Sequence, residues 1–203
     1  MKGCRPPKKE QLLRGIREFE KRETRDAMYK VSTDVISRYW GDPEKMANAI
    51  GVLLLTWNQA FYRYAPFDFD RLEVCIKKNL KALSKFRRRS ILTFSDSDER
   101  AVVNLFNDFL KALKTSKGRT PVGAVKALHL LAPSFFPLWD DRISRAYHCY
   151  YSKNPAKKYI DFFRMNQKLA KNSGLESYSK KHGKTIPKLI DEYNYAKYTW
   201  GWV

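Results

Sequence analysis

The sequence predicts an all-α, globular protein, and three observations support this fold class. Apolar residues recur at spacings of three and four along nearly the whole chain, as they do on one face of an α-helix. Helix start signals precede several of these segments, including Asp42-Pro43 and Thr120-Pro121. A hydrophobic fraction of 43%, with 12 Phe, 12 Tyr and 5 Trp, is typical of a folded core rather than a disordered chain.

The first half of the chain predicts five helices. Residues 8–24 and 26–39 each place their apolar side chains on one face, and residues 42–61 form the most apolar helix, with Asp42 as the N-cap. Pro66 interrupts the chain before a helix over 68–86, whose outer face carries four lysines. The next helix starts within 97–99 and runs to about Leu113.

The second half predicts four further helices. Thr120-Pro121 begins a short helix that runs to Leu131, and a loop with two prolines follows over 132–139. Asp140 or Asp141 caps a helix to about Tyr151, and residues 155–172 and 185–199 form the last two. Nine to eleven helices over 203 residues are expected to form one domain, with possible lobes at 25–115 and at 1–24 plus 116–203.

The balance of charge indicates a nucleic acid as partner. The chain has 40 Lys and Arg against 21 Asp and Glu, a net charge of +19. Solubility requires only a few charges, and a surplus this large opposes the compact state by self-repulsion. A polyanion relieves that repulsion and releases counterions on binding. A membrane surface or another acidic partner is the alternative.

Cysteine usage and hydropathy indicate a reducing compartment. Cys4, Cys75 and Cys149 are odd in number and far apart, which predicts neither a disulfide framework nor a metal or iron–sulfur site. The apolar run over 50–55 is too short for a membrane span, and the N-terminal residues lack the apolar core of a signal peptide. We therefore expect a monomer in the cytoplasm (at the nucleoid) or in a nucleus, not secreted, without a cofactor or metal.

Two segments have the residue types of a functional site. In the first, residues 117–127, a basic turn with Lys117, Gly118 and Arg119 leads into a capped helix, whose start can bind a phosphate. In the second, residues 136–147, Asp140 stands at a helix start after a proline-containing loop. Each segment taken alone also fits an ordinary capped helix with solvated side chains.

Together, the two segments resemble the helix-hairpin-helix superfamily of DNA glycosylases over about 30 residues. That family has a Gly-rich hairpin ending in Val-Gly, then a lysine and an alanine, and then an aspartate followed by a Val-x-Arg segment. The positions that match this pattern are Val122, Gly123, Ala127, Asp140, Ile143 and Arg145.

The chain also departs from the family pattern. Residues 119–123 read Arg-Thr-Pro-Val-Gly, Lys126 is displaced by one position, and Arg142 stands where a histidine is usual. No cluster of four cysteines follows. The displaced lysine puts a lyase activity in question.

The resemblance implies a base-excision repair enzyme. Such enzymes flip a damaged or mismatched base of double-stranded DNA into a cleft between two helical lobes and cleave its N-glycosidic bond. Asp140 would stabilise the oxocarbenium-like sugar, and Lys126 would be the nucleophile of an AP-lyase reaction, or else a solvated or phosphate-binding lysine. Arg142 and Arg145 would contact DNA, and Trp139 would line the base pocket.

If the resemblance to DNA glycosylases holds, a third segment, residues 54–63, would also contribute to DNA binding. Asn58 and Gln59 resemble the polar residue that fills the gap left by the flipped base, and Arg63 could reach a phosphate. Trp57 fits either a base pocket or the core. The aromatic residues over 193–202 fit core packing better than base stacking.

Two other functions stay open. One is a non-catalytic helical protein that binds DNA or RNA with the basic turn, and the other is an enzyme of this fold that acts on a free or modified nucleotide. The sequence does not identify the base or lesion.

Overall fold

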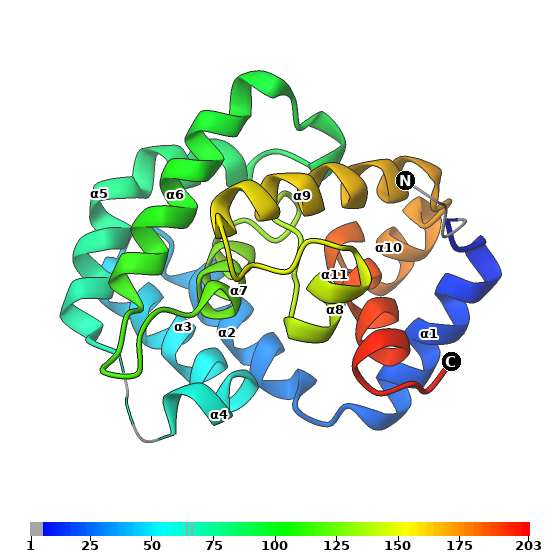
Figure 1. Cartoon of the computed structure of the whole chain (residues 1–203), viewed down its shortest axis with the longest axis horizontal. Coiled ribbons are helices and arrows are strands. Elements are labelled where there is room, and N and C mark those ends of the chain that lie inside the picture. The colour runs from blue at the N-terminus through cyan, green and yellow to red at the C-terminus, as the bar shows by residue number, and fades with distance from the viewer. Residues whose placement is uncertain (1–5, 64, 66) are drawn as a thin grey trace.

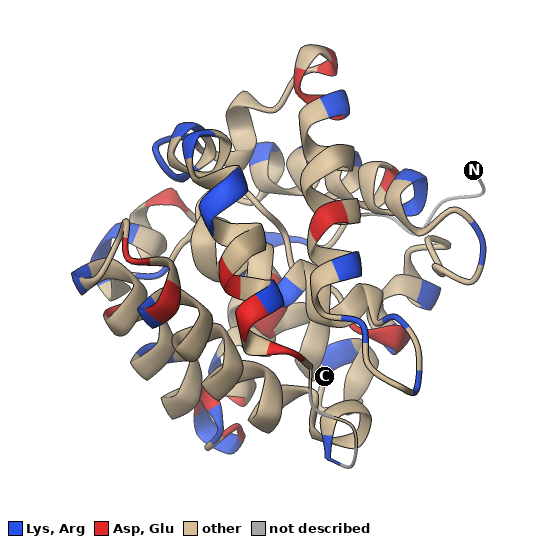
Figure 2. Cartoon of the chain, turned by 90° about the vertical axis from the view of Figure 1, so that its left-hand side faces the viewer, with Lys and Arg blue, Asp and Glu red and all other residues tan. Residues whose placement is uncertain are grey.

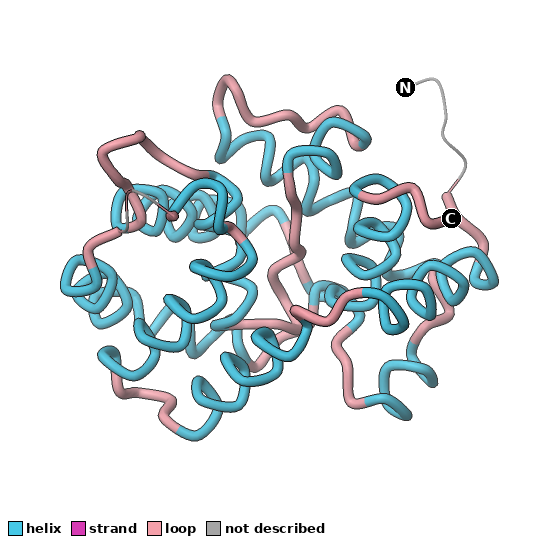
Figure 3. The backbone as a smooth tube through the Cα atoms, turned by 90° about the horizontal axis from the view of Figure 1, so that it is seen from below, coloured by secondary structure: helices cyan, strands magenta, loops and turns pink. Residues whose placement is uncertain are grey.

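The computed structural model describes all residues except 1–5, 64 and 66. Its described residues form eleven α-helices and no β-strand, so the predicted all-α class is confirmed (Figures 1 and 3). The helices are α1 (Lys9–Arg22), α2 (Asp26–Arg38), α3 (Pro43–Trp57), α4 (Gln59–Tyr62), α5 (Phe69–Arg87), α6 (Glu99–Ala112), α7 (Pro121–Leu131), α8 (Asp141–Ala146), α9 (Pro155–Asn172), α10 (Glu176–His182) and α11 (Ile186–Asn194). Two 3-10 turns, η1 (Ile91–Thr93) and η2 (Asp96–Asp98), precede α6, and a short π-helix, η3 (Tyr195–Thr199), extends α11.

Local capping explains where several helices begin. The carboxylate of Asp42 accepts a hydrogen bond from the Lys45 backbone N–H, and the Thr120 hydroxyl accepts one from Gly123 N–H. Both residues precede a proline at the first helical position, which has no N–H to satisfy. These two predicted helix starts are therefore confirmed.

Two predicted helices have other bounds in the structure, and one helix was not predicted. The helix expected to reach Tyr151 ends at Ala146, because the chain turns there and His148 adopts a left-handed conformation (φ 55°). The helix expected over 42–61 is divided at Asn58 into α3 and α4. Helix α10 was not predicted, because its seven residues bury no side chain and have no apolar face. Pro66, predicted to interrupt the chain, lies outside the described residues.

Helix α7 lies at the centre of the molecule and is buried along nearly its whole length (Figure 1). It packs against α2, α3 and α6, while α1 packs against α11 and η3. Gly15 permits the second packing, since a Cβ there would lie 2.6 Å from the Tyr193 ring. One hydrophobic core joins all these helices, and the division into two lobes stays a prediction.

The charged surface is spread over several elements rather than gathered on one helix (Figure 2). The four lysines predicted on the outer face of α5 are exposed: Lys77, Lys78, Lys81 and Lys85. Cys75 and Cys149 are buried free thiols, and Cys4 lies outside the described residues. Within the described chain, no helix combines the length and apolar character needed to cross a bilayer.

Candidate functional site

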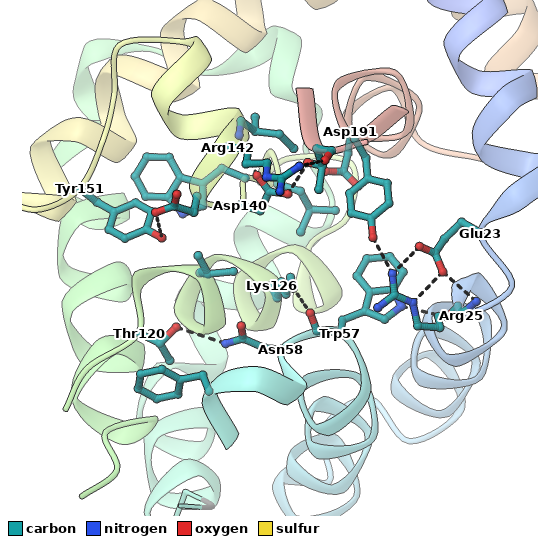
Figure 4. Close-up of a pocket in the computed structure, with 18 of the residues that line it drawn as sticks. Glu23, Arg25, Trp57, Asn58, Thr120, Lys126, Asp140, Arg142, Tyr151 and Asp191 are labelled. Carbon is teal, nitrogen blue, oxygen red and sulfur yellow. Dashed lines mark hydrogen bonds and ion pairs between the residues drawn. The ribbon is translucent and has the colours of Figure 1, made fainter. Parts of the chain in front are cut away.

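A cavity of about 390 Å³ opens where α1, α3, α7, α8, α11 and η3 meet. This volume falls within the range of roughly 300–1,000 Å³ that is typical of small-molecule and cofactor sites. Asp140, Arg142 and Asp191 line one side, and Trp57, Asn58 and Thr120 line the opposite side (Figure 4). Glu23 and Arg25 lie at one end of the cavity and Tyr151 at the other, and Phe19 and Tyr195 also line it.

Lys126 projects from α7 into this cavity and is 8% exposed. Its Nζ donates a hydrogen bond of 2.7 Å to the Trp57 carbonyl at the end of α3. Burial lowers the pKa of Lys126 to about 8, although the nearby carboxylates of Asp140 and Asp191 act in the opposite direction. About a tenth of this amine is therefore neutral at pH 7, far more than for a lysine with the ordinary pKa of 10.5.

Asp140 is the N-cap of α8 and lines the same cavity. One carboxylate oxygen accepts a 2.7 Å hydrogen bond from Ile143 N–H, and the other accepts a 2.5 Å hydrogen bond from the Thr199 hydroxyl. The Arg142 guanidinium donates to the Thr199 carbonyl, so the end of η3 is bound at two points. These bonds fix the carboxylate at the cavity wall, across from α3.

Asp191, on α11, is a second carboxyl group at the cavity that the sequence did not indicate. It is 7% exposed, and burial raises its pKa to about 7, with the charge of Lys188 acting in the opposite direction. The sequence places Asp191 on a predicted helix next to Glu192, a pattern that fits an exposed helix face equally well. Only the packing of α11 against α1 reveals that it is enclosed.

A buried ion-pair cluster supports α11 next to Asp191. Lys188 Nζ lies 3.0 Å from an Asp26 carboxylate oxygen and 3.1 Å from one of Glu192. Its ammonium also lies 4.2 Å from the centre of the Phe19 ring. Since the two charged neighbours compensate it, the pKa of Lys188 is raised despite complete burial. This lysine is held charged, in contrast to Lys126.

Arg25 and Glu23 form one end wall of the cavity. The Arg25 guanidinium donates to both Glu23 carboxylate oxygens, at 2.8 and 2.6 Å, and to the Tyr195 hydroxyl at 2.6 Å. The hydrogen bond to Glu23 is the main reason that the pKa of Arg25 is raised. This connection ties the start of α2 to η3.

The two tryptophans predicted for a base pocket both line the cavity. Trp57 is half-buried, stacks on Tyr29 with ring centroids 5.6 Å apart, and donates from Nε1 to the Arg25 carbonyl. Trp139 is 1% exposed and packs against Tyr151 and Tyr159. Both therefore have core contacts, and their role toward a base stays a prediction.

The polar residues of the third predicted segment lie in different environments. Asn58 is half-buried at the cavity and donates a 3.2 Å hydrogen bond to the Thr120 hydroxyl. Gln59 and Arg63, from α4 and its C-cap, are exposed. Phe61 is partly buried against the core and lines the cavity.

The start of α7 differs from the free phosphate site that the sequence suggested. Val122 and Gly123 are buried, and Gly123 N–H is already bound by Thr120. Lys117 and Arg119 are exposed on the turn before the helix, and Gly118 pairs with Thr115 in an isolated β-bridge. A phosphate role for this turn therefore depends on the two exposed cations and not on the helix start.

The two arginines of α8 are exposed beside Asp140 and Asp141. Arg145 forms an ion pair of 2.8 Å with Asp141 and lies 3.6 Å from the Tyr150 ring centre. Arg142 lines the cavity itself. Both arginines are accessible to an anionic partner at the cavity edge.

Fold and site together define an all-α protein in which one partly open cavity is lined by a lysine with a lowered pKa and by several carboxyl groups, among them Asp140 and Asp191. Among the described residues, no group of three or more His, Cys, Asp and Glu side chains is placed to hold a metal ion. Comparisons with protein-family models, curated proteins and solved structures found no match to this chain.

Proposed function

We propose that this protein is a DNA glycosylase of base-excision repair that also has AP-lyase activity. The observation that carries the proposal is the cavity itself, which Lys126 and Asp140 both line although they are 14 positions apart in the chain. A cavity of about 390 Å³ gives room for a flipped base, and the net charge of +19 supplies attraction to the DNA backbone.

The chemistry follows from the state of each group. The neutral amine of Lys126 attacks C1′ of the deoxyribose, the glycosidic bond breaks, and the base leaves with the bonding electrons and takes up a proton. Asp140, fixed by Ile143 N–H and the Thr199 hydroxyl, stabilises the positive charge that develops on the sugar. The Schiff base formed on Lys126 then permits strand cleavage.

Asp191 supplies a further polar group on the cavity wall. No hydrogen bond within the described chain occupies its carboxyl group, so it is available to the edge of a bound base. Trp57, half-buried at the cavity, supplies aromatic surface for a flipped base, and the buried Trp139 supports the cavity wall behind it.

Base release from lesion-containing duplexes tests the glycosylase proposal. Oligonucleotides carrying uracil, a thymine mismatch, 8-oxoguanine or an alkylated adenine identify the substrate. Asp140→Asn is expected to abolish base release while DNA binding is kept, and Asp70→Asn, on an exposed residue outside the cavity, serves as the control. Unchanged turnover in Asp140→Asn would contradict the proposal and favour a non-catalytic nucleic-acid-binding protein.

Borohydride trapping on an abasic-site duplex tests the lyase step. A covalent adduct is expected with the wild-type protein and with Lys111→Ala, which removes an exposed lysine, but not with Lys126→Ala. An adduct that survives Lys126→Ala would exclude Lys126 as the nucleophile.

A further inference from the structure

Only one of the five tryptophans is exposed. Trp200 is 53% exposed, whereas Trp139 is buried and Trp40, Trp57 and Trp202 are half-buried. Burial of this indole would stabilise the fold, and its exposed ring leaves a large aromatic surface that a partner can contact.

Trp200 belongs to a stack that the chain builds after η3. Gly201 adopts a left-handed conformation (φ 66°), which turns the chain so that Trp202 N–H donates to the Ala196 carbonyl at 2.7 Å. The rings of Trp200 and Trp202 are then nearly parallel, 10° apart, with centroids separated by 5.8 Å. The Arg22 guanidinium lies 5.5 Å from the centre of the Trp202 ring. We call Arg22, Trp202 and Trp200 the indole stack.

The stack is held in place by the same residues that form the cavity. The Tyr195 ring meets both indoles edge-on, at 6.4 Å from Trp200 and 6.2 Å from Trp202. Thr199, one residue before Trp200, lines the cavity and is bound by Asp140 and Arg142. Trp200 therefore lies just outside the cavity, next to its wall.

The charged residues near the indole stack indicate what kind of planar ligand would bind to it. Two exposed guanidinium groups contact this segment: Arg22, which is also paired with Glu18, lies near the Trp202 ring, and Arg142 donates to the Thr199 carbonyl. Their positive charge favours a partner that carries negative charge. Trp202 covers one face of Trp200, and a planar ring can stack on the other. An unpaired nucleobase flanked by phosphates has both the planar ring and the negative charge. Stacking of a base on an aromatic side chain does not depend on the base sequence.

We propose that Trp200 is a stacking site for an unpaired nucleobase outside the cavity. The inference rests on the proposed nucleic-acid binding, but not on base release. It assigns to this protein a preference for DNA with an extrahelical or single-stranded base over perfectly paired DNA.

The test compares two labelled duplexes of equal length, one perfectly paired and one with a single bulged thymine. Binding is measured at fixed salt with Asp140→Asn protein, so that no base is released. We expect tighter binding of the bulged duplex, and Trp200→Ala to weaken it at least about 5-fold while leaving the paired duplex unchanged. Trp200→Phe should restore much of the preference, and Tyr39→Ala, which removes an exposed aromatic residue elsewhere, should have no effect.

Several outcomes would overturn the inference. Equal losses on both duplexes, or no loss on either, would exclude a base-stacking role for Trp200. Binding of anionic phosphatidylserine vesicles that depends on Trp200 more than duplex binding does would assign the residue to a lipid surface instead. A second measurement needs no substitution of Trp200 itself. The bulged duplex should protect Trp200 of the Asp140→Asn protein from N-bromosuccinimide oxidation more than the paired duplex does, and equal oxidation contradicts the proposal.

The outcomes also separate this inference from the proposed function. A protein that releases bases but lacks any preference dependent on Trp200 keeps the proposed function and loses the stacking site. A protein that prefers the bulged duplex but releases no base from any lesion keeps the stacking site and loses the proposed function.

Discussion

Replacing Lys126 by methionine is expected to stabilise the fold. The pKa of Lys126 is lowered from 10.5 to about 8, so keeping this amine charged at neutral pH costs the folded state about 3 kcal/mol. Methionine fills a similar volume without a charge, but it loses the hydrogen bond to the Trp57 carbonyl, which contributes about 1 kcal/mol. The net gain is therefore about 2 kcal/mol, or about 4–8 °C in Tm for a chain of this length.

The dependence of this gain on pH provides the sharper test. The unfolded chain holds a proton on Lys126 up to its ordinary pKa, whereas the folded protein releases it at about 8. Wild-type stability from this group therefore rises between pH 8 and 10.5, and the advantage of Lys126→Met shrinks over the same window.

Thermal unfolding of wild type, Lys126→Met and Lys111→Met at pH 7, 8, 9 and 10 measures both effects. The exposed Lys111 is the control, and its replacement should change stability by less than about 0.5 kcal/mol. A Lys126→Met protein that unfolds at a lower temperature than wild type at pH 7 would refute the reasoning. So would a stability difference that stays constant up to pH 10.

The remaining predictions concern the cavity and its supports. The yield of borohydride-trapped adduct should rise about tenfold per pH unit below 8 and level off above it, and a midpoint near 10 would show that Lys126 is not the amine titrated. The pKa of Asp191 is raised to about 7, so the folded state holds a proton on this group more tightly than the unfolded state does. The contribution of Asp191 to stability therefore falls as the pH rises from 4 to 7, and Asp191→Asn should flatten this fall in the free energy of unfolding measured by urea titration. Lys188→Ala removes one of the two lysine partners of Asp26 and of Glu192, which keep Lys30 and Lys184, and should destabilise by about 1–3 kcal/mol, measured by the urea midpoint. Gly123→Ala places a Cβ about 2.5 Å from the Tyr62 hydroxyl and should lower stability by about 1–3 kcal/mol, and a neutral result would show that the helices separate easily there.

Local signals predicted much of the fold from the sequence. Asp42 and Thr120 were identifiable as caps because capping involves only the next few residues, and both cap bonds are present. Helix α10 was missed because its stability comes from its place between α9 and α11 and not from an apolar face. The early end of α8 depends on the turn at His148, which no strong breaker residue marks.

The site was predictable only where its residues carry their own signal. Lys126 is the sole acidic or basic residue of an otherwise apolar segment over 121–128, and such a helix is buried on all sides. Asp191 and Arg25 gave no such signal, because each becomes part of the cavity only when α11 and the start of α2 meet across the fold. Asp191 and Arg25 reach the cavity only through the packing of segments that are distant in the sequence, and no local sequence pattern shows that packing.

The hydrogen bond from Thr199 to Asp140 makes the site sensitive to partial opening of the structure. Thr199 ends a five-residue π-helix in which only Ala196 is buried, so this segment is a weak cooperative unit compared with α7. Fraying of that last turn would free Asp140 and displace Tyr195 while the central helices stay folded. Heating should therefore abolish activity below the temperature of global unfolding, and hydrogen exchange at residues 195–200 should precede exchange in α7.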